Sequence, residues 1–333
     1  MIFGKRYTGK LIPLIVVGIL MLCTAALKAQ DKSAVTVAKD GSGDFSSIQK
    51  AIDGCKAYPD QRVTIFVKNG TYREKVVVPS CNTKLSIIGE SAEKTILTYD
   101  DHFTKINRGR NSTFYTYTLL VQANEFRLEN FTVENSAGPV GQAVALHTEG
   151  DRSVFVRCRI LGNQDTAYGA GSYSNQLFRD CYIEGTTDFI FGEATLFFEN
   201  CRIHCKSDSY ITAASTPEGK PFGFVFRNCK ITADEKVQKV YLGRPWRNFA
   251  KVAFLNCEMG SFVRPEGWQN WSKPESEKTT LFAEYGNTGA GAKTAGRVTW
   301  SHQLSSTAAE KYTKASVFVP QNWEKATTNE WFN

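Results

Sequence analysis

The segment 154–160, VFVRCRI, decides the fold, because close copies of it recur at 177–183 (LFRDCYI), 196–203 (LFFENCRI), 224–231 (FVFRNCKI) and 252–259 (VAFLNCEM). An earlier copy, FRLENFTV at 126–133, carries Phe131 where the later ones carry cysteine. From Phe131 the spacings to the successive repeat cysteines are 27, 23, 20, 28 and 28 residues. Periods of roughly 20 to 30 residues with short strands and no long helix are typical of a solenoid.

Strands that recur once per coil run parallel to one another. The repeat therefore predicts an all-β, single-domain parallel β-helix, to which the β-rich runs at 35–40, 63–67, 70–78 and 85–89 add further short strands. The alternative is a sandwich of β-hairpins. That alternative requires tight turns between neighbouring strands, and the repeats lie too far apart for two-residue loops.

Both ends of the predicted solenoid depart from the repeat. Apolar residues at helical spacing over 45–55 predict a short capping helix at the N-terminal end, with Asp44 as its N-cap. After the last repeat we expect an irregular C-terminal extension. In it, Trp268 and Trp271 are predicted to lie on a surface excursion, and residues 305–312 to form a short closing helix.

Residues 1–29 have the pattern of a secretory signal peptide. Basic residues precede an apolar run of 17 residues from Leu11 to Leu27, and Ala29 offers a cleavage point. The run is shorter than the about 20 residues of a membrane-spanning helix. An uncleaved anchor is the alternative, because Leu27 is large for a small-residue cleavage site. We expect residues 30–333 to be the exported domain, whether periplasmic, on the cell surface or extracellular.

The charge of the mature chain is nearly balanced. Cleavage after Ala29 removes four basic residues and no acidic one, which leaves 36 basic and 33 acidic residues. This balance gives no support to nucleic acid as a partner.

Eight cysteines remain after cleavage, an even number that in an exported protein suggests disulfides. Five of them occupy one frame of the repeat, where a stacked cysteine serves as a small buried hydrophobe. The sequence does not decide whether one disulfide forms among four cysteines: Cys55, Cys81, Cys201 and Cys205.

Two aspartates recur at one offset, since Asp165 and Asp188 each follow a repeat cysteine by seven residues. Residues at equal offsets lie about 4.8 Å apart on neighbouring coils. Gln142 and Asp165 both precede a repeat cysteine by 16 residues, and Asp188 and Arg244 both precede one by 13. We therefore predict one column of Gln142, Asp165 and Asp188, with Arg244 two coils beyond Asp188.

Such a column separates the chemical roles of the two carboxylates. Adjacent carboxylates do not ionise independently, and Arg244 favours the ionised form of Asp188, which leaves Asp165 with the raised pKa. One is then suited to act as nucleophile or base and the other as general acid. Gln142 and Gln164 offer N–H donors to a developing oxyanion. The alternative is that both aspartates only cap turns.

The sequence offers few residues for metal-dependent catalysis or for a serine nucleophile. The chain has four histidines, none paired at metal-ligand spacing, and no G-x-S-x-G motif. His147 is read as a polar residue carried on a strand. Tyr168, Phe191 and Trp246 flank the carboxylates and can stack on sugar rings, although a role in the core is their alternative, and Phe189 is expected to be core.

The motifs around these residues resemble the pectin methylesterases, also called pectinesterases. The resemblance is carried by segments 40–45 (DGSGDF), 70–74 (GTYRE), 137–139 (AGP), 142–146 (QAVAL), 164–166 (QDT), 188–192 (DFIFG) and 242–246 (LGRPW). Three later segments extend it past residue 283: AEY at 283–285, GAGA at 289–292 and RVTW at 297–300. On these motifs the chain is identified as a bacterial-type secreted member of that family.

The resemblance implies a right-handed parallel β-helix that hydrolyses the C6 methyl esters of galacturonate in pectin without a metal or organic cofactor. It implies Asp188 as the nucleophile and Asp165 as the acid that protonates methanol and then activates water. Gln142 and Gln164 would form the oxyanion hole, and Arg244 would hold Asp188.

By the same resemblance, Tyr168, Phe191 and Trp246 would line the sugar subsites. The chain departs from the family at His147, where many relatives carry arginine, and in the looser stretch 169–175. These departures bear on subsite preference more than on the chemistry. Pectin is the expected partner and a monomer the expected state.

Two other functions stay open on the sequence. A pectin-cleaving lyase or glycoside hydrolase is one, because parallel β-helices host those activities and two carboxylates about 5 Å apart suit a retaining glycosidase. A glycan-binding solenoid without activity is the other.

Overall fold

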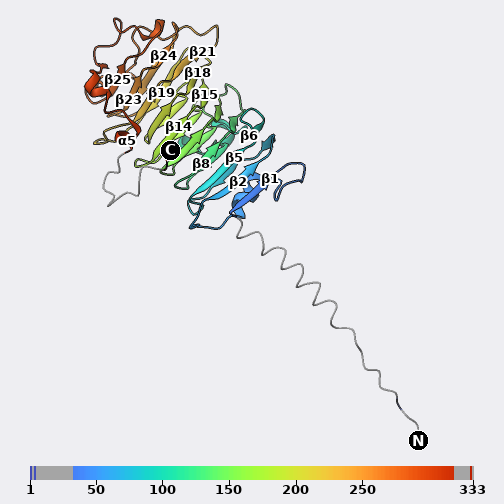
Figure 1. Ribbon diagram of the computed structural model, residues 1–333. Coiled ribbons are helices and arrows are strands. Elements are labelled where there is room, and N and C mark those ends of the chain that lie inside the picture. Colours follow the sequence, from blue (N-terminus) through green and yellow to red (C-terminus); the bar gives the residue numbers. More distant parts are fainter. Residues whose placement is uncertain (2–3, 5–32, 319–330, 332–333) are drawn as a thin grey trace.

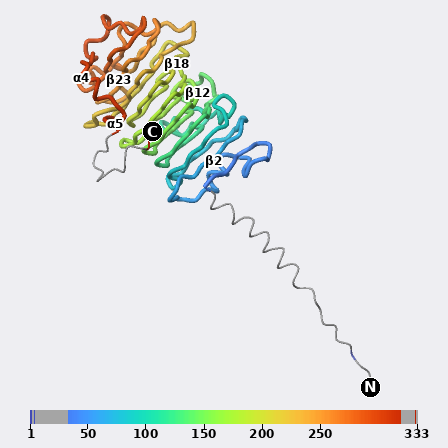
Figure 2. Tube along the Cα trace, viewed as in Figure 1, coloured from blue at the N-terminus to red at the C-terminus, as the bar shows by residue number. Residues whose placement is uncertain are grey.

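The computed structural model describes residues 1, 4, 33–318 and 331 of the chain. Over that part, short strands wind into a parallel β-helix whose coils rise from the N-terminal to the C-terminal end (Figures 1 and 2). The coils build three sheets, which we call A, B and C, of 11, 8 and 7 strands. The predicted predominance of parallel strands is confirmed, because neighbouring strands in each sheet pair in parallel.

The strand bounds follow the order of the coils. Sheet A contains β1 Ala34–Val37, β2 Val63–Val67, β5 Leu85–Gly89, β8 Arg127–Glu129, β11 Ser153–Val156, β14 Asn175–Arg179, β17 Thr195–Glu199, β20 Phe224–Arg227, β23 Lys251–Leu255, β25 Leu281–Tyr285 and β26 His302–Gln303. Sheet B contains β3 Gly70–Arg73, β6 Thr95–Tyr99, β9 Thr132–Asn135, β12 Arg159–Leu161, β15 Tyr182–Gly185, β18 Arg202–Cys205, β21 Lys230–Ala233 and β24 Glu258–Met259. Sheet C contains β4 Val76–Val78, β7 Leu119–Val121, β10 Leu146–Thr148, β13 Ala167–Gly169, β16 Ile190–Gly192, β19 Tyr210–Ala214 and β22 Tyr241–Pro245.

Each copy of the sequence repeat is two strands with a corner between them. The first strand belongs to sheet A and the second to sheet B, and the residue before the repeat cysteine turns the chain. Six such corner residues have φ between 50° and 55°: Asn130, Arg157, Asp180, Asn200, Asn228 and Asn256. Asn and Asp tolerate this left-handed backbone better than other side chains do, which explains why they fill five of the six corners.

The interior is filled by columns of like side chains. One column of phenylalanines runs up sheet A, with successive ring centroids 4.3 to 4.8 Å apart: Phe155, Phe178, Phe198, Phe226 and Phe254. Such stacked pairs add about 0.5–1.5 kcal/mol each beyond the burial of their area. Phe189 is fully buried, so its predicted place in the core is confirmed.

The repeat cysteines form a second buried column, as predicted. Each thiol donates to a carbonyl of the preceding coil, as from Cys181 Sγ to Phe155 O at 3.4 Å. From Cys55 to Cys257 all the described cysteines are free thiols, so the disulfide left open by the sequence is not formed.

The predicted N-terminal helix is α2, Ile48–Asp53. The prediction of Asp44 as its N-cap residue was wrong. The N-cap is Ser47, whose hydroxyl accepts from Lys50 N at 3.3 Å. Asp44 lies too early for that role and instead accepts from Thr36 N of β1 at 2.8 Å.

The C-terminal extension is irregular, as predicted, but Trp268 is not on the surface. It is 1% exposed and packs on Phe282, with ring centroids 4.6 Å apart. Its Nε1 donates to Glu284 Oε1 at 3.2 Å, which explains why a buried indole is tolerated there. The remaining elements of this end are η2 Pro274–Lys278, η3 Ala290–Ala292, α4 Ser306–Ala309 and α5 Lys314–Val317.

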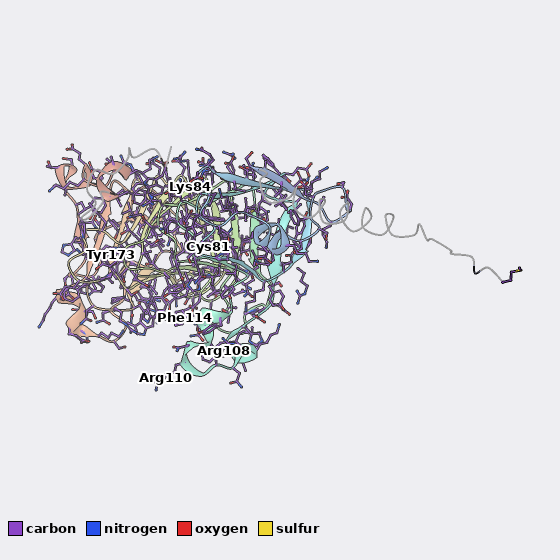
Figure 3. The ribbon with its side chains drawn as sticks, turned by 90° about the horizontal axis from the view of Figure 1, so that it is seen from below. Cys81, Lys84, Arg108, Arg110, Phe114 and Tyr173 are labelled. Atoms are coloured by element: carbon purple, nitrogen blue, oxygen red, sulfur yellow. The ribbon has the colours of Figure 1, made fainter. Side chains whose placement is uncertain are left out.

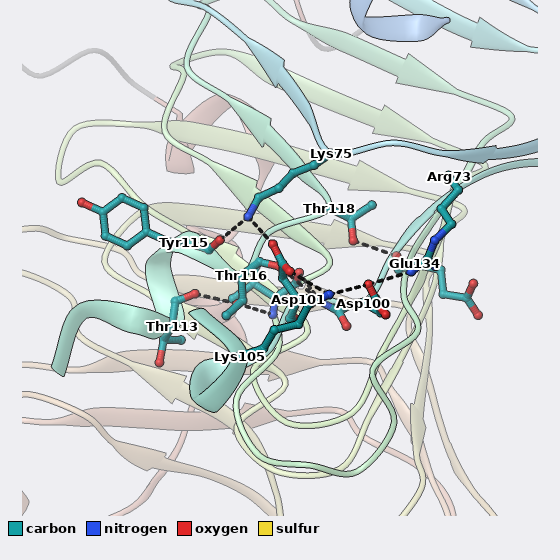
Figure 4. Close-up of polar contacts among 12 residues, drawn as sticks. Arg73, Lys75, Asp100, Asp101, Lys105, Thr113, Tyr115, Thr116, Thr118 and Glu134 are labelled. Atoms are coloured by element: carbon teal, nitrogen blue, oxygen red, sulfur yellow. Dashed lines mark hydrogen bonds and ion pairs between the residues drawn. The ribbon is translucent and has the colours of Figure 1, made fainter. Parts of the chain in front are cut away.

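A segment at 100–118 leaves the coils between β6 and β7. It holds α3 Phe103–Ile106 and η1 Gly109–Tyr115, and Figure 3 shows it projecting from the body with Arg108, Arg110 and Phe114 on it. Ion pairs anchor its base: Lys75 Nζ lies 2.6 Å from Asp101 Oδ2, and Lys105 Nζ lies 2.8 Å from Asp100 Oδ1 (Figure 4).

The predicted signal peptide, residues 1–29, lies outside the described residues apart from Met1 and Gly4. In the part of the chain that is described, no helix is long and apolar enough to cross a membrane.

Candidate active site

Asp165 and Asp188 lie on neighbouring coils, each two residues before a strand of sheet C. Asp165 precedes β13 and Asp188 precedes β16, and the pairing of these strands places the two aspartates in one column. Asp165 N donates to Thr187 O at 3.1 Å, which extends the same register. Both residues have left-handed backbone, with φ of 63° and 50°. Aspartate tolerates this backbone better than most side chains do, as at the corners between sheets A and B.

Arg244 on β22 contacts Asp188 with two hydrogen bonds. Its Nε lies 3.0 Å from Asp188 Oδ1 and its Nη2 lies 2.6 Å from Oδ2. This fork geometry is the strongest form of a carboxylate ion pair. The guanidinium also lies over two rings, 4.0 Å from the centroid of Tyr210 and 3.6 Å from that of Trp271. The position and direction of the Asp188 carboxylate are therefore fixed.

The equal offsets that led to Arg244 do not reflect its true register. Arg244 pairs with Ala213, which pairs with Phe191, so Arg244 belongs to the column of Phe191 rather than that of Asp188. The turn after β16 has two residues and the turn after β22 has five, and this three-residue difference produced the matching offsets. The contact predicted between Arg244 and Asp188 exists because the long side chain reaches across the intervening coil, where its guanidinium lies over Tyr210, to the Asp188 carboxylate.

The two glutamines lie side by side. Gln142 bridges Gln164, and Ala143 N donates to Gln164 O at 3.1 Å. The prediction that Gln142 aligns with Asp165 was therefore wrong by one residue. The neighbouring side chain of Gln164 lowers the pKa of the Asp165 carboxyl, against the larger effect of burial. Gln142 O accepts from Phe103 N at 2.9 Å, which joins the site to the 100–118 segment.

The electrostatic environment distinguishes the two carboxylates. Burial, followed by the nearby charge of Asp188, raises the pKa of Asp165 well above its usual range. Burial also raises the pKa of Asp188, but the hydrogen bonds and charge of Arg244 oppose that rise. We expected Arg244 to have the larger effect on the pKa of Asp188, but the effect of burial is larger. The predicted order is kept, since Asp165 has the more strongly raised pKa and is the better proton donor.

The three predicted aromatic residues form one cluster on the outer face of sheet C. The rings of Tyr168 and Phe191 are stacked with centroids 4.6 Å apart, and Trp246 lies 5.9 Å from Phe191. Phe114, from the 100–118 segment, completes the cluster at 5.2 Å from Tyr168. Aromatic faces beside paired carboxylates suit a ligand with apolar sugar faces.

His147 lies in the same outward column as Tyr168, one coil earlier. Its ring is 4.6 Å from that of Tyr168, and its Nε2 lies 3.2 Å from Glu149 Oε1. It is therefore a strand-borne polar residue, as predicted, and it also borders the aromatic cluster.

Sequence reasoning missed Tyr210, Trp271, Phe114 and Glu193. Tyr210 and Trp271 hold the guanidinium of Arg244, and Glu193 Oε2 accepts from the Tyr168 hydroxyl at 3.3 Å. None of them belongs to a repeated frame, because Trp271 and Phe114 come from irregular segments and Tyr210 follows a turn of a different length. Among the described residues, no group of three or more His, Cys, Asp or Glu could hold a metal ion.

The fold and the site define a class: a β-helix hydrolase with paired carboxylates beside an aromatic surface. The family model for pectinesterase matches residues 34–322. The chain belongs to the pectinesterase family, whose members are carboxylic ester hydrolases.

Relatives in plants share much of the sequence. Pectinesterase 31 of Arabidopsis thaliana is 39% identical over 295 residues, which cover 86% of this chain and 92% of the relative. The probable pectinesterase/pectinesterase inhibitor 6 of the same plant is 40% identical over 313 residues, 90% of this chain but 55% of the longer relative. The chain thus spans about half of such longer relatives.

Solved structures of pectin methylesterases share the fold. The carrot enzyme superposes with a TM-score of 0.80 at 33% identity, covering 85% of this chain and 92% of that one. The Aspergillus niger enzyme gives a TM-score of 0.76 at 29% identity, over 86% of this chain and 94% of that one. The right-handed parallel β-helix implied by the resemblance is thereby confirmed. The bacterial-type character we expected receives no support, because the two relatives described above are plant proteins.

Proposed function

We propose that this protein hydrolyses the C6 methyl esters of pectin, releasing methanol and leaving free galacturonate carboxylates on an uncut chain. The observation that carries the proposal is the contrast between the two aspartates. Asp188 is held by both hydrogen bonds of Arg244, whereas Asp165 is buried beside it with a strongly raised pKa. A fixed carboxylate and a neighbouring acid match the needs of acyl transfer.

In the proposed first step, an Asp188 oxygen attacks the ester carbonyl carbon. Negative charge moves to the carbonyl oxygen, where the amides of Gln142 and Gln164 donate hydrogen bonds. The carbon–methoxy bond then breaks, and Asp165 gives its proton to the departing oxygen, so that methanol leaves. The remaining group is a mixed anhydride between Asp188 and the galacturonate.

In the second step, the ionised Asp165 takes a proton from water, and the hydroxide attacks the galacturonate carbonyl of the anhydride. The bond to Asp188 breaks, which restores both aspartates and releases the product carboxylate. One ester and one water become one carboxylic acid and one methanol. Tyr168, Phe191 and Trp246 are the proposed sugar-contacting surface, because their rings gather beside the carboxylates.

The test uses methanol release from highly methylated pectin together with the length of the polymer. The wild-type protein should release methanol without new reducing ends or unsaturated products, and Asp188→Ala should not release it. Asp60→Ala is the matched control, because the Asp60 side chain is 89% exposed on the surface. Chain shortening would support the lyase or glycosidase alternative, and full activity of Asp188→Ala would refute the assigned nucleophile.

Export belongs to the same proposal. We infer that residues 1–29 are a signal peptide and that residues 30–333 act outside the cytoplasm as a monomer, without nucleic-acid or membrane partners after cleavage. The bacterial-type secreted character is also part of the proposal and rests on the sequence pattern alone. N-terminal sequencing of the exported protein, with its mass in solution from light scattering, tests these points.

A further inference from the structure

A column of charged and aromatic side chains runs along the outer face of sheet B, on a different sheet from the paired aspartates. Arg159 of β12, Tyr182 of β15 and Arg202 of β18 stand in register on successive strands. The residue after each of them is a fully buried isoleucine, and the side chains of a strand alternate between its two faces. The three side chains of the column therefore point outward, toward the solvent.

Two guanidinium groups flank the ring of one tyrosine in this column. Arg159, one strand before Tyr182, lies 5.5 Å from the centroid of its ring, and Arg202, one strand after it, lies 5.9 Å away. The Tyr182 hydroxyl donates to Glu184 Oε2 at 2.9 Å, which fixes the ring, and Arg202 Nε donates to Thr232 Oγ1 at 3.2 Å. In the part of the chain that the structure describes, neither guanidinium has a carboxylate at ion-pair distance. Both therefore keep charged donors for a ligand.

A groove with a volume of about 570 Å³ opens at the start of the column. Its lining comes from the turn 90–93, between β5 and β6, and from four residues of later coils: Asn130, Arg157, Arg159 and Tyr182. The hydroxyl of Thr132 donates to Ala92 O at 2.5 Å, which holds the turn beside sheet B. Arg157 is already bound to Glu129 and to Asn130 Oδ1. Arg159 is therefore the cation of the groove that can accept a new partner.

The same groove also offers negatively charged acceptors. Glu90 and Glu93 line it together with Arg159, and both glutamates are exposed. A simple anion bound by Arg159 would be repelled by these carboxylates. A ligand with both a carboxylate and hydroxyl groups suits the groove better, because its carboxylate accepts from the guanidinium and its hydroxyls donate to the glutamates. A uronic acid sugar has this combination of groups.

We propose that the groove and the column on sheet B form a second polysaccharide site, which binds a de-esterified uronate segment of pectin. Arg159 binds one sugar carboxylate in the groove. Arg202 stands two strands further, about 10 Å away at the usual strand spacing, and binds a carboxylate on a later unit of the same extended chain. The choice of ligand rests on the proposed function, because that reaction leaves uronate carboxylates on the polymer. A polymer bound here keeps its remaining esters at high effective concentration near the aspartates.

Calorimetry with fully de-esterified oligogalacturonate counts the binding sites. We expect the double variant Arg159→Gln/Arg202→Gln to have one site fewer than the wild type, and the affinity of that site in the wild type to fall with added salt. The same number of sites with the same affinities in both proteins would overturn the proposal. Inorganic phosphate at equal concentration should not displace the oligosaccharide from this site. Displacement would reveal a site for simple anions and would also overturn it.

This count separates the second site from the proposed activity. If the wild type released no methanol from pectin, the proposed function would fail, while the loss of one binding site in the double variant would still establish the site on sheet B. Thermal unfolding of the double variant checks that it is folded. Arg202→Gln alone, a change at an exposed position, should weaken the same site about tenfold and gives the same comparison if the double variant is unstable.

Methanol release tests the consequence for the polymer. In the double variant, KM for partly de-esterified pectin should rise at least about threefold with kcat retained, because the polymer is no longer held at a second point. KM for a methylated trigalacturonate, too short to reach both sheets, should not change. An unchanged KM for pectin, or an equal rise for both substrates, would overturn the second point of attachment.

The matched control is Lys56→Gln/Lys311→Gln, which removes the same number of positive charges away from sheet B. The Lys56 side chain is 56% exposed after α2, and Lys311 is exposed between α4 and α5. We expect this variant to keep the number of binding sites and the KM of the wild type. The loss of one site in the control would show that overall charge, rather than the column on sheet B, is responsible, and would overturn the proposal.

Discussion

Arg244 binds both carboxylate oxygens of Asp188 although the two residues stand two coils apart and in different columns of sheet C. The Arg244 side chain reaches across the intervening coil, and its guanidinium lies against the rings of Tyr210 and Trp271. Because these rings fix the guanidinium and two hydrogen bonds join it to Asp188, the Asp188 carboxylate is held in one orientation. The proposed chemistry depends on that orientation more than on the charge alone.

Replacing Arg244 by lysine should therefore impair the reaction although the charge is kept. Lysine cannot form two parallel hydrogen bonds to a carboxylate, and a charge-assisted hydrogen bond contributes about 1.5–3 kcal/mol. We expect kcat for methanol release to fall by about tenfold or more. An unchanged kcat in a variant that unfolds like the wild type would contradict a positioning role for the fork.

The pH dependence should have two limbs. Activity requires Asp188 ionised and Asp165 protonated, so the rate rises as pH passes the pKa of Asp188 and falls as it passes the higher pKa of Asp165. Replacing Arg244 by methionine removes the charge that lowers the pKa of Asp188. The acidic limb of kcat/KM should then move to higher pH, and a limb that stays in place would contradict the assignment.

Asp165 should make the protein less stable at high pH. Its folded pKa lies above the unfolded value, so the folded state binds the proton more tightly. That contribution to stability is fully present below the ordinary carboxyl pKa and is lost as pH rises through the folded pKa. Urea unfolding of Asp165→Asn should show greater stability than the wild type at high pH and a vanishing difference in acid. A variant less stable at high pH would contradict this sign.

Removing either proposed oxyanion donor should lower kcat with little change in KM. Loss of one such donor typically costs about 10²–10³-fold in rate. We expect Gln142→Ala and Gln164→Ala to fall in that range when methanol release is measured. Gln238→Ala is the control, because Gln238 is exposed and lies outside sheet C. Variants that raise KM alone would show that these glutamines bind the substrate equally before and during the reaction.

The phenylalanine column should dominate the stability of the central coils. Phe198 is fully buried between Phe178 and Phe226, with centroids 4.8 and 4.4 Å away. Phe198→Ala should lower the free energy of unfolding by about 3–5 kcal/mol. Tyr173→Ala is the control, since Tyr173 is 83% exposed and its loss should change stability by less than about 0.5 kcal/mol. Equal losses in the two variants would contradict the role of the column.

The repeat was sufficient to predict the stacking of the coils because every copy must bury the same side chains against the next. A phenylalanine or cysteine in one frame meets its copy one coil away, so periodicity along the chain becomes a column in space. The pair Asp165 and Asp188 was found in this way, since the segments from Cys158 and Cys181 to these residues have equal lengths. Local spacing alone determined this part of the site.

The tertiary structure decided the contacts between residues that are separated along the chain by turns of unequal length. Counting from the repeat cysteines misplaced Arg244 by three residues and Gln142 by one, because a turn adds residues without adding a strand pair. Tyr210 and Trp271 could not be found by any spacing. The sequence therefore determined which side chains of the repeated strands stack on their copies in neighbouring coils. Only the folded chain decided which side chains meet across turns of unequal length, because irregular turns carry no periodicity.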